Sequence, residues 1–536
     1  MAGSLLLALL ALPGCASLPS LEGREESAAL RDVAGTPIHD ALAAPLAAHP
    51  GLSGIYVLRD GEDAFAARIA LIDAAARSLD IQYYIWHDDL TGRLMFDAVR
   101  RAADRGVRVR LLLDDNNTVG LDPTLAAFDA HANIEVRLFN PFMQRSLRLL
   151  AFLTDFARLN RRMHNKSMTA DGAATIVGGR NVGDEYFAFG TNIGFVDLDV
   201  VAVGPAVVAV VKSFDDYWRC DSAYPVARLL PPATAADVAV LAQRGEAVRG
   251  EPRAARYLAK VADTRVMRDL VAQELPFEWA VARLVVDEPS KGLGKAQPGG
   301  LLLSNLDAAF GGPAKYELAI VSPYFVPGRR GTRMLRRFAE SGVKLKILTN
   351  ALESTDVAAV HSGYAKRRRD LLKSGAELYE LRRDASAAAA AAVVPGPKLA
   401  SGRRARPKRS ADTVAGAGGS GSGGSGSRSG SSASSLHAKT IAVDAERIYI
   451  GSFNVDPRSA VHNTELGLVI DSASMAGALS LLFLKEIPQA AYQVRLDGHR
   501  KLEWIELRPD GSVIRHHDEP GASLGRRIAV TLLGLL

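Results

Sequence analysis

The segment His164–Asp171 reads HNKSMTAD, and the segment His437–Asp444 reads HAKTIAVD. In each segment a lysine follows the histidine by two positions and an aspartate follows it by seven. The agreement continues downstream, because GGRN at 178–181 and GSFN at 451–454 both end in an asparagine 17 residues after the histidine. A lone histidine on a strand is usually a packed or surface residue, but two copies in the same register indicate a duplicated site.

Each motif is expected to lie on a β-strand, because apolar residues surround it at positions typical of a sheet core. Side chains two positions apart on a strand share a face, so the histidine and lysine of each motif would project toward one site. The expected core positions are Met168, Ile176 and Val177 around the first motif, and Ile441, Val443, Ile448 and Ile450 around the second.

A strand, a helix and a second strand follow one another twice along the chain. The expected elements lie at 80–86, 92–104 and 107–113 in the first copy, and at 318–321, 332–340 and 343–348 in the second. This repeat predicts an α/β protein made of two tandem domains. We expect mostly parallel sheets that pack against each other, with the active site at their interface.

A chain of 536 residues is too long for one ordinary hydrophobic core, so we expect two domains. Its 48% hydrophobic and 23% charged content is typical of a folded globular protein. An Ala run, a basic patch at 403–409 and a Gly/Ser tract together predict a flexible insertion inside the second domain. We therefore expect a signal segment at 1–20, an N-terminal domain at 45–226, a connector with its own helices at 227–300, a C-terminal domain at 301–495 with the insertion at 385–435, and a tail at 496–536.

The chain carries a formal charge of +6, which suits phosphate-bearing partners, whether anionic lipid or nucleic acid. Its cysteines are Cys15 and Cys220, which excludes a disulfide framework and a Cys-rich zinc module. Composition alone does not show whether the partner is a lipid or a nucleic acid.

The motifs carry the groups that phosphodiester transfer needs, namely a nucleophile, a proton donor for the leaving alkoxide, and positive charge for the phosphoryl oxygens. One imidazole must be neutral to attack phosphorus, and the other must be protonated to act as the acid. The sequence alone leaves the two histidines interchangeable.

The duplicated motif, with its following Gly-Gly/Ser-x-Asn, resembles the phospholipase D superfamily. Within it the chain is most similar to the bacterial cardiolipin synthases, especially the C-type branch. Three segments carry this finer resemblance: YYIWHDDLTG at 83–92, SPYFVPG at 322–328 and GSFNVDPRS at 451–459. The resemblance runs from about residue 51 to about residue 520.

The resemblance implies that His164 is the nucleophile and His437 the general acid. It also implies that Lys166 and Lys439 hold the non-bridging oxygens, with hydrogen bonds from the amides of Asn181 and Asn454. This phosphohistidine chemistry requires no metal and no cofactor.

A carboxylate downstream of each motif is expected to orient the imidazole of that motif. Glu465 matches this position in the second half. In the first half Asp197 aligns, with Asp199 as a rival. Asp171 and Asp444 are expected to be structural, paired with basic side chains or backbone.

Two further acidic clusters have a structural explanation. His87-Asp88-Asp89 and Asp114-Asp115 could suggest a metal site, but each follows a strand, where a helix N-cap is the ordinary role of such residues.

The N-terminal segment resembles a bacterial lipoprotein signal, because a short apolar run over 5–12 ends in Leu-Pro-Gly-Cys at Cys15. A plain secretory segment with a chance cysteine is the alternative. Acylated Cys15 would anchor the protein in the cell envelope, facing the periplasm, on the inner or the outer membrane. The C-terminal residues 524–536 could lie in a membrane interface or pack onto the body.

The leading hypothesis is transfer of a phosphatidyl group between phospholipids, with cardiolipin as the product. The resemblance implies phosphatidylglycerol as one lipid and phosphatidylethanolamine as a candidate for the other, at a membrane surface. Water as the acceptor would make the protein a phospholipase. A nuclease and a catalytically inactive binding protein are weaker alternatives, so we expect no nucleic acid partner, and the need for an accessory protein stays open.

Overall fold

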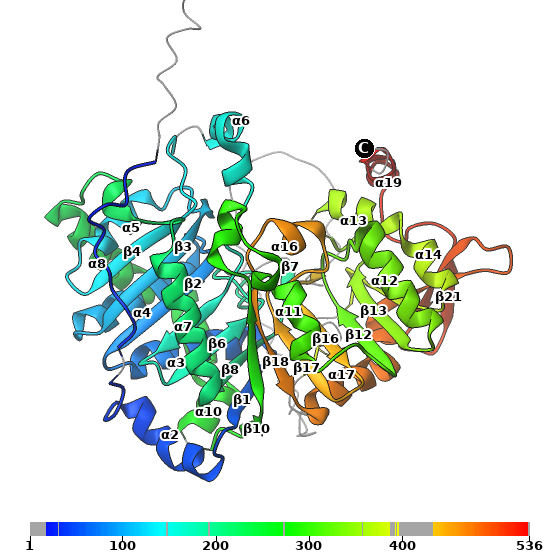
Figure 1. The fold of residues 1–536 in the computed structure, drawn as a ribbon, viewed down its shortest axis with the longest axis horizontal. Coiled ribbons are helices and arrows are strands. Elements are labelled where there is room, and N and C mark those ends of the chain that lie inside the picture. The colour runs from blue at the N-terminus through cyan, green and yellow to red at the C-terminus, as the bar shows by residue number, and fades with distance from the viewer. Residues whose placement is uncertain are drawn as a thin grey trace, which may run out of the picture.

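The computed structural model describes residues 18–30, 32–145, 148–190, 193–271, 274–355, 357–385, 392, 394–395 and 433–533. Two α/β halves lie side by side, each built on one large sheet (Figure 1). The predicted two-domain α/β architecture is therefore confirmed. Cys15 and nearly all of the insertion predicted at 385–435 lie outside the described residues.

The first half contains a nine-stranded sheet in the order β10-β1-β8-β6-β5-β2-β3-β4-β9. Its strands are β1 (Ser53–Leu58), β2 (Ser78–Ile85), β3 (Arg108–Asn117), β4 (Ile134–Phe139), β5 (Ser167–Ala170), β6 (Ala174–Gly178), β8 (Asp199–Val203), β9 (Ala223–Pro225) and β10 (Glu278–Ala280). The helices are α2 (Pro37–Ala48), α3 (Gly61–Ala74), α4 (Leu90–Asp104), α5 (Asp122–Asp129), α6 (Arg148–Leu159), α7 (Pro205–Arg219), α8 (Ala235–Gly250), α9 (Pro252–Ala262) and α10 (Arg265–Val271).

The second half contains a ten-stranded sheet in the order β11-β18-β17-β16-β12-β13-β14-β19-β20-β21. Its strands are β11 (Ala282–Val286), β12 (Glu317–Val321), β13 (Lys344–Asn350), β14 (Glu377–Leu381), β16 (Thr440–Val443), β17 (Arg447–Gly451), β18 (Leu466–Asp471), β19 (Ala491–Leu496), β20 (Leu502–Leu507) and β21 (Val513–His516). The helices are α11 (Leu302–Ala309), α12 (Gly328–Glu340), α13 (Ala358–Ala365), α14 (Arg368–Lys373), α16 (Pro457–Val461), α17 (Ala473–Lys485), α18 (Ile487–Ala490) and α19 (Leu524–Leu533).

The sheets are mixed, so the prediction of mostly parallel sheets was wrong. Only β2-β3-β4 and β12-β13-β14 pair in parallel among the strands of the two large sheets, and the other neighbours are antiparallel. The strand-helix-strand repeats account for the parallel pairs, because a helical crossover returns the chain in the same direction. The motifs lead into short hairpins, β5-β6 and β16-β17, which pair antiparallel with β2 and β12. The histidine and lysine of each motif come just before β5 or β16, so the prediction that these side chains lie on a strand was wrong.

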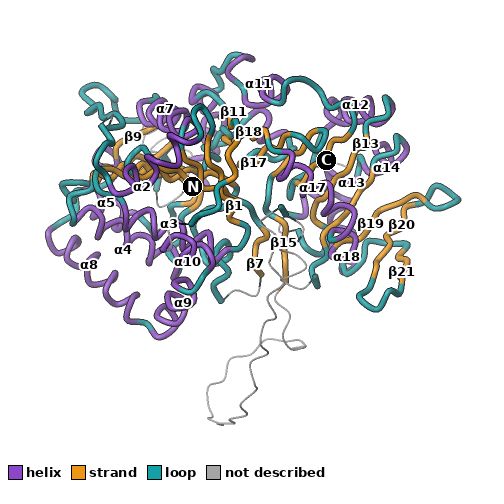
Figure 2. The backbone as a smooth tube through the Cα atoms, turned by 90° about the horizontal axis from the view of Figure 1, so that it is seen from below, coloured by secondary structure: helices purple, strands orange, loops and turns teal. Residues whose placement is uncertain are grey.

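The two halves share one apolar core. Val177 and Val200 of the first sheet belong to the same buried cluster as Ile450 and Leu468 of the second. A separate two-stranded parallel sheet, β7 (Ile193–Val196) with β15 (Ala433–Leu436), also joins the halves. Figure 2 shows β7 and β15 next to each other between them. The halves are thus held as one body around the motifs.

The connector and the tail both contribute to the sheets. The helices expected in the connector are α8, α9 and α10, and the strands after them, β10 and β11, pair with β1 and β18 respectively. The chain therefore passes from the first sheet into the second within this segment. Strands β20 and β21, in the segment suggested as a tail, extend the second sheet. Of the helices described, none combines the length and apolar character needed to cross a bilayer.

Candidate active site

The two motif histidines are each held by backbone of the opposite half. The N–H of His164 donates to the carbonyl of Thr464 at 2.9 Å, and the N–H of His437 donates to the carbonyl of Val196 at 2.7 Å. Both side chains are almost fully buried, with exposed fractions of 7% and 6%. The site therefore lies at the interface of the halves, as the sequence predicted.

The carboxylates that orient the imidazoles are exchanged between the halves. Nδ1 of His164 lies 2.8 Å from Oε2 of Glu465, and Nδ1 of His437 contacts Oδ2 of Asp197. The expectation that each carboxylate serves the histidine of its own half was wrong, because Val196 and Thr464 bring the loops that carry them across the interface. In both pairs Nδ1 is occupied, which leaves Nε2 as the atom available to react.

Asp199, the rival to Asp197, has a structural role. Its carboxylate lies 2.9 Å from the guanidinium of Arg68 and 3.3 Å from that of Arg180, and all three side chains are buried. Asp199 also accepts the backbone N–H of Arg180 at 3.1 Å. This network supports the GGRN segment and does not contact either histidine.

The lysines and asparagines of the motifs are buried next to the histidines. Nζ of Lys166 donates to the carbonyl of His164 at 2.6 Å, and Nζ of Lys439 lies 2.8 Å from Nδ1 of His437. The amide of Asn181 donates to the Tyr186 hydroxyl at 2.9 Å. Oδ1 of Asn454 is buried and has no hydrogen-bond partner among the described residues. These groups surround the histidines with donors suited to a phosphoryl group.

Aromatic rings pack against both imidazoles. The Tyr84 ring meets His164 edge to face at a centroid distance of 5.0 Å. Phe195 stacks on His437 at 5.0 Å, and Tyr186 meets the same ring at 5.1 Å. Tyr84 stands in the segment that carried the finer resemblance, whereas nothing in the sequence singled out Tyr186 or Phe195. The rings limit rotation of the imidazoles and exclude water from them.

The environment of the first pair favours a neutral imidazole. Burial lowers the pKa of His164 well below its ordinary value, and the charges of Lys166 and Lys439 lower it further. Burial also raises the pKa of Glu465 to about 7, although the charge of Lys166 opposes this. A neutral His164 with its Nδ1 held by Glu465 is suited to nucleophilic attack.

The second pair has a firmly ionised carboxylate. Burial alone would raise the pKa of Asp197, but the charges of His437 and Lys439 hold it below its usual range. Burial and Lys439 lower the pKa of His437, and Asp197 opposes both. An ionised Asp197 stabilises a protonated His437, which suits the role of general acid. The net pKa shift of both imidazoles is downward, but at His437 the ionised Asp197 opposes it, which favours His437 for the role of acid.

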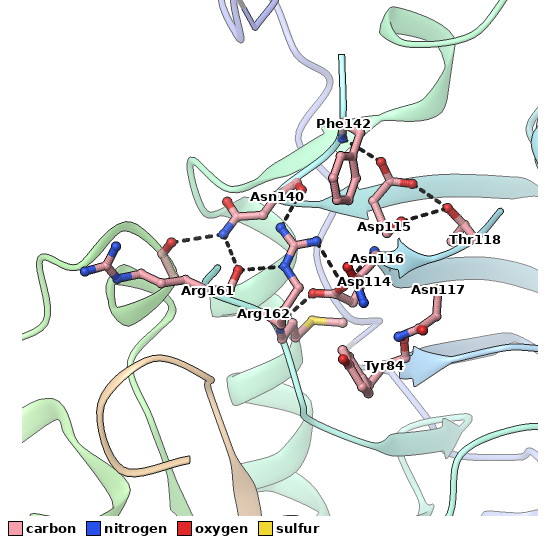
Figure 3. A network of polar contacts seen from close by, with 12 residues as sticks. Tyr84, Asp114, Asp115, Asn116, Asn117, Thr118, Asn140, Phe142, Arg161 and Arg162 are labelled. Carbon is pink, nitrogen blue, oxygen red and sulfur yellow. Dashed lines mark hydrogen bonds and ion pairs between the residues drawn. The ribbon is translucent and has the colours of Figure 1, made fainter. Parts of the chain in front are cut away.

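The segment that leads into His164 is anchored on the end of β3 (Figure 3). Oδ2 of Asp114 accepts the backbone N–H of Met163 at 2.7 Å, and Oδ1 lies 3.2 Å from the guanidinium of Arg162. Arg162 also donates to the carbonyl of Asn140 at 2.8 Å. Asp114 and Arg162 are both buried, and burial raises the pKa of Asp114 to about 6. This pair therefore positions the residue next to the nucleophile.

The helix-cap prediction was right for one acidic cluster and wrong for the other. Asp89 is the N-cap of α4 and accepts the N–H of Gly92 at 3.0 Å. Asp114 and Asp115 instead lie within β3, and Asp115 accepts the N–H of Phe142 at 2.7 Å. Strand β3 continues to Asn117, past the end expected at residue 113. These carboxylates therefore lie on the strand and bind the loops that pass its C-terminal end.

One group of possible metal ligands occurs among the described residues. Ligand atoms of His87, Asp89 and Glu185 lie within 4.8 Å of one another. Nδ1 of His87 forms an ion pair with Glu185 at 3.3 Å, and Asp89 is engaged as the helix cap. The ion pair and the cap account for these side chains, and the absence of a metal requirement stays a prediction.

Asp171 and Asp444 bind backbone in equivalent ways. Asp171 accepts the N–H groups of residues 76, 77 and 78 at 2.7–2.9 Å. Asp444 accepts those of residues 315, 316 and 317 at 2.7–3.1 Å. Each aspartate therefore ties the turn of its motif hairpin to the start of the neighbouring parallel strand, and its purely structural role stays a prediction.

Comparison with known proteins agrees with the geometry. Residues 69–218 and 424–486 match the family model described as "Cardiolipin synthase, PLD-like domain". The chain is 44% identical over 488 residues to cardiolipin synthase C of Escherichia coli strain K12, which covers 91% of this chain and 96% of that protein. It is 32% identical over 499 residues to an uncharacterized protein of Helicobacter pylori strain J99, covering 92% of this chain and 90% of that one.

A solved structure shows the same fold. The crystal structure of phosphatidylserine synthase from Haemophilus influenzae Rd KW20 superposes with a TM-score of 0.50 at 15% identity, covering 85% of this chain and 91% of that one. The sequence identity to cardiolipin synthase C extends over nearly the full length of both chains. On this identity, and on the paired histidines at the interface, the chain belongs to the phospholipase D-like family of cardiolipin synthases.

Proposed function

We propose that this protein synthesises cardiolipin by moving a phosphatidyl group from one phospholipid to another through a phosphohistidine at His164. The observation that carries the proposal is the pair of buried histidines, each oriented through Nδ1 by a carboxylate of the opposite half. The pKa of both imidazoles is lowered, but the ionised Asp197 opposes this lowering at His437, which supports His164 as nucleophile and His437 as acid.

In the first step Nε2 of His164 attacks the phosphorus of the donor lipid. The bond from phosphorus to the headgroup oxygen breaks, and His437 gives its proton to the departing alkoxide. Lys166 and Lys439 neutralise the charge on the non-bridging oxygens, and Asn181 and Asn454 donate hydrogen bonds to them. The products are a phosphatidyl group on His164 and a free headgroup alcohol.

In the second step a hydroxyl of the acceptor lipid attacks the phosphohistidine. His437, now neutral, takes the hydroxyl proton, and the bond from Nε2 of His164 to phosphorus breaks. The enzyme returns to its starting protonation state. If water took the place of the lipid hydroxyl, the product would be phosphatidic acid, so the acceptor decides between a transferase and a hydrolase. The aromatic rings around both imidazoles favour the lipid acceptor because they limit the access of water.

The proposed substrates are phosphatidylglycerol and, for the other lipid, phosphatidylethanolamine. We further propose that the protein is a lipoprotein acylated at Cys15, bound to the inner or the outer membrane and facing the periplasm. The Leu-Pro-Gly-Cys sequence supports this placement. Whether an accessory protein takes part is left to the same experiment.

The test is lipid mass spectrometry on membranes of a cardiolipin-deficient bacterial host that expresses the wild type, His164→Ala or His437→Ala. We expect cardiolipin with the wild type and none with either variant. Phosphatidic acid without cardiolipin would establish a hydrolase instead. No lipid change with a folded wild type, alone and when coexpressed with neighbouring genes of its source genome, would contradict the proposal.

A further inference from the structure

Helix α6 has an apolar face that points away from the protein. Leu153 and Phe156 are 81% and 60% exposed, and they lie on either side of a kink at Asp155, whose φ and ψ are not helical. The opposite side packs into a small cluster through Ala151 and Leu159 against Phe142. A helix with apolar residues on both sides is typical of a buried or membrane-bound segment, because a water-facing side is normally polar.

Helix α19 has the same property. Leu524 and Ile528 are 73% and 51% exposed and lie four residues apart, on one side of the helix. Val530 on the other side is buried against Leu352. Figure 1 shows α6 and α19 standing out from the same side of the molecule, one on each half. Two helices far apart in the sequence, each with exposed apolar residues, thus stand on one side of the molecule.

Helix α16 connects this side to the active site. Val461 is 58% exposed, and three residues later the carbonyl of Thr464 accepts the backbone N–H of His164. Arg458 of the same helix donates to the side chain of Asn160, just beyond α6, at 2.6 Å. Helices α6 and α16 therefore adjoin the part of the protein that holds His164.

Positive charge accompanies these residues. The stretch 144–162 contains five arginines and one aspartate, and the stretch 523–533 contains two arginines and no acidic residue. Arg161, Arg458 and Arg526 have no acidic partner among the described residues. Burial and the charges of Arg161 and Arg458 lower the pKa of His462 next to them. A surface with exposed apolar side chains and guanidinium groups that have no acidic partner is complementary to anionic headgroups over acyl chains.

Strand β3 holds α6 in place. Phe142, Asp115 and Thr118 lie near the C-terminal end of β3 in Figure 3. Arg145 forms an ion pair with Asp115 at 2.8 Å, and Arg148 forms one with the same carboxylate at 3.4 Å. The outward direction of Leu153 and Phe156 is therefore built into the fold.

We propose that α6, α16 and α19 form the membrane-docking face of this enzyme, which inserts Leu153, Phe156, Val461, Leu524 and Ile528 into an anionic phospholipid bilayer. This inference rests on the proposed function, because phospholipid substrates reside in the membrane. Docking by this face places His164 and His437 over the lipid surface. Donor and acceptor lipids then reach the site with their headgroups while their acyl chains stay in the bilayer.

The experiment is cosedimentation of the full chain, carrying Cys15→Ser to remove any acyl anchor, with vesicles of phosphatidylglycerol and phosphatidylethanolamine. The test variant is Leu153→Ser/Phe156→Ser. The matched control is Val208→Ser/Leu484→Ser, on α7 and α17, whose side chains are 70% and 65% exposed. We expect the test variant to lower the partition constant by roughly tenfold or more, since each side chain loses its burial in the lipid, and the control to match the parent protein.

Equal vesicle binding by the parent protein, the test variant and the control variant would overturn the proposal, and so would an equal loss of binding in the test and control variants. A change from dimer to monomer in the test variant, with no change in vesicle binding, would also overturn it. Phosphatidylcholine vesicles should bind less than the anionic ones, and high salt should weaken binding. Turnover of a lipid dispersed in detergent should be the same in the test variant and the control. Vesicle binding without cardiolipin formation in the lipid assay would contradict the proposed function but would still support the docking face.

Discussion

Nδ1 of His164 lies 2.8 Å from Oε2 of Glu465, a residue 301 positions further along the chain. The reciprocal contact joins His437 to Asp197, 240 positions earlier. Neither half can orient its own histidine, because the carboxylate that does so belongs to the other. The two motifs therefore form a single catalytic site, which exists only when the two sheets are packed together.

The exchanged pairs predict a specific pattern of energetic coupling. In double-mutant cycles with His164→Ala and Glu465→Gln, or with His437→Ala and Asp197→Asn, we expect coupling energies of about 0.5–3 kcal/mol. Each pair shares a buried contact, so removing the second partner costs less once the first is absent. Urea unfolding of the single and double variants measures these energies.

The within-half cycles are the control for this experiment. Pairing His164→Ala with Asp197→Asn, and His437→Ala with Glu465→Gln, should give smaller coupling than the exchanged pairs do. Glu465→Gln and Asp197→Asn should each also lower kcat, by about 10²–10⁴-fold, because the amide has no negative charge and can turn its NH2 group toward Nδ1, which favours the wrong tautomer. Stronger coupling within the halves than between them would contradict the geometry.

The pH dependence of kcat/KM should follow His164 and Lys166, in addition to the loss of the proton from His437, whose pKa is also lowered. Burial and the two lysine charges lower the pKa of His164 well below 6.5, so the neutral nucleophile persists and the acid limb should lie below pH 6.5. Burial lowers the pKa of Lys166 to about 7, so its charge is lost and activity should fall as the pH rises above about 7. In Lys166→Arg the guanidinium stays charged. Its residual activity should therefore lack this alkaline limb, and an unchanged limb would assign the titration to another group.

Gly179 should be essential for the position of Asp197. A Cβ atom at Gly179 would lie 2.1 Å from Oδ1 of Asp197, so Gly179→Ala must displace the carboxylate that orients His437. We expect kcat to fall by about 10²-fold, as for a small misplacement of a catalytic group, while circular dichroism stays that of the folded protein. Gly194→Ala is the matched control, since its Cβ would meet nothing within 4 Å. Equal activity of the two variants would contradict the prediction.

Asp171 and Asp444 should matter for stability and not for chemistry. Replacing either with alanine removes an acceptor from three backbone N–H groups, and we expect a loss of about 1–3 kcal/mol in the free energy of unfolding. Asp171→Ala should cost more than Asp444→Ala, because Asp171 is buried whereas water can reach the partners of Asp444. The asparagine variants, which keep one oxygen acceptor and tolerate the positive φ of these positions, should lose less. A drop in kcat of the folded variants would indicate a catalytic role instead.

The residue spacing was enough to predict which groups share one buried site. Two histidines, two lysines and two asparagines in the same register were predicted to share a site, and the structure buries them together at one interface. The helices and strands of the repeated units were also predictable, because side-chain periodicity and turn residues act over a few positions. These features are local, so the order of the amino acids along the chain determines them.

The tertiary structure decided the rest. The antiparallel hairpins β5-β6 and β16-β17 within each sheet, the rings of Tyr186 and Phe195 on His437, and the choice of Asp197 over Asp199 depend on contacts between distant segments. So does the exchange of Glu465 and Asp197 between the halves. Spacing along the chain sets which face of a strand a side chain occupies. Which carboxylate approaches which imidazole is set by how two sheets share one apolar core, and that packing is a property of the folded chain as a whole.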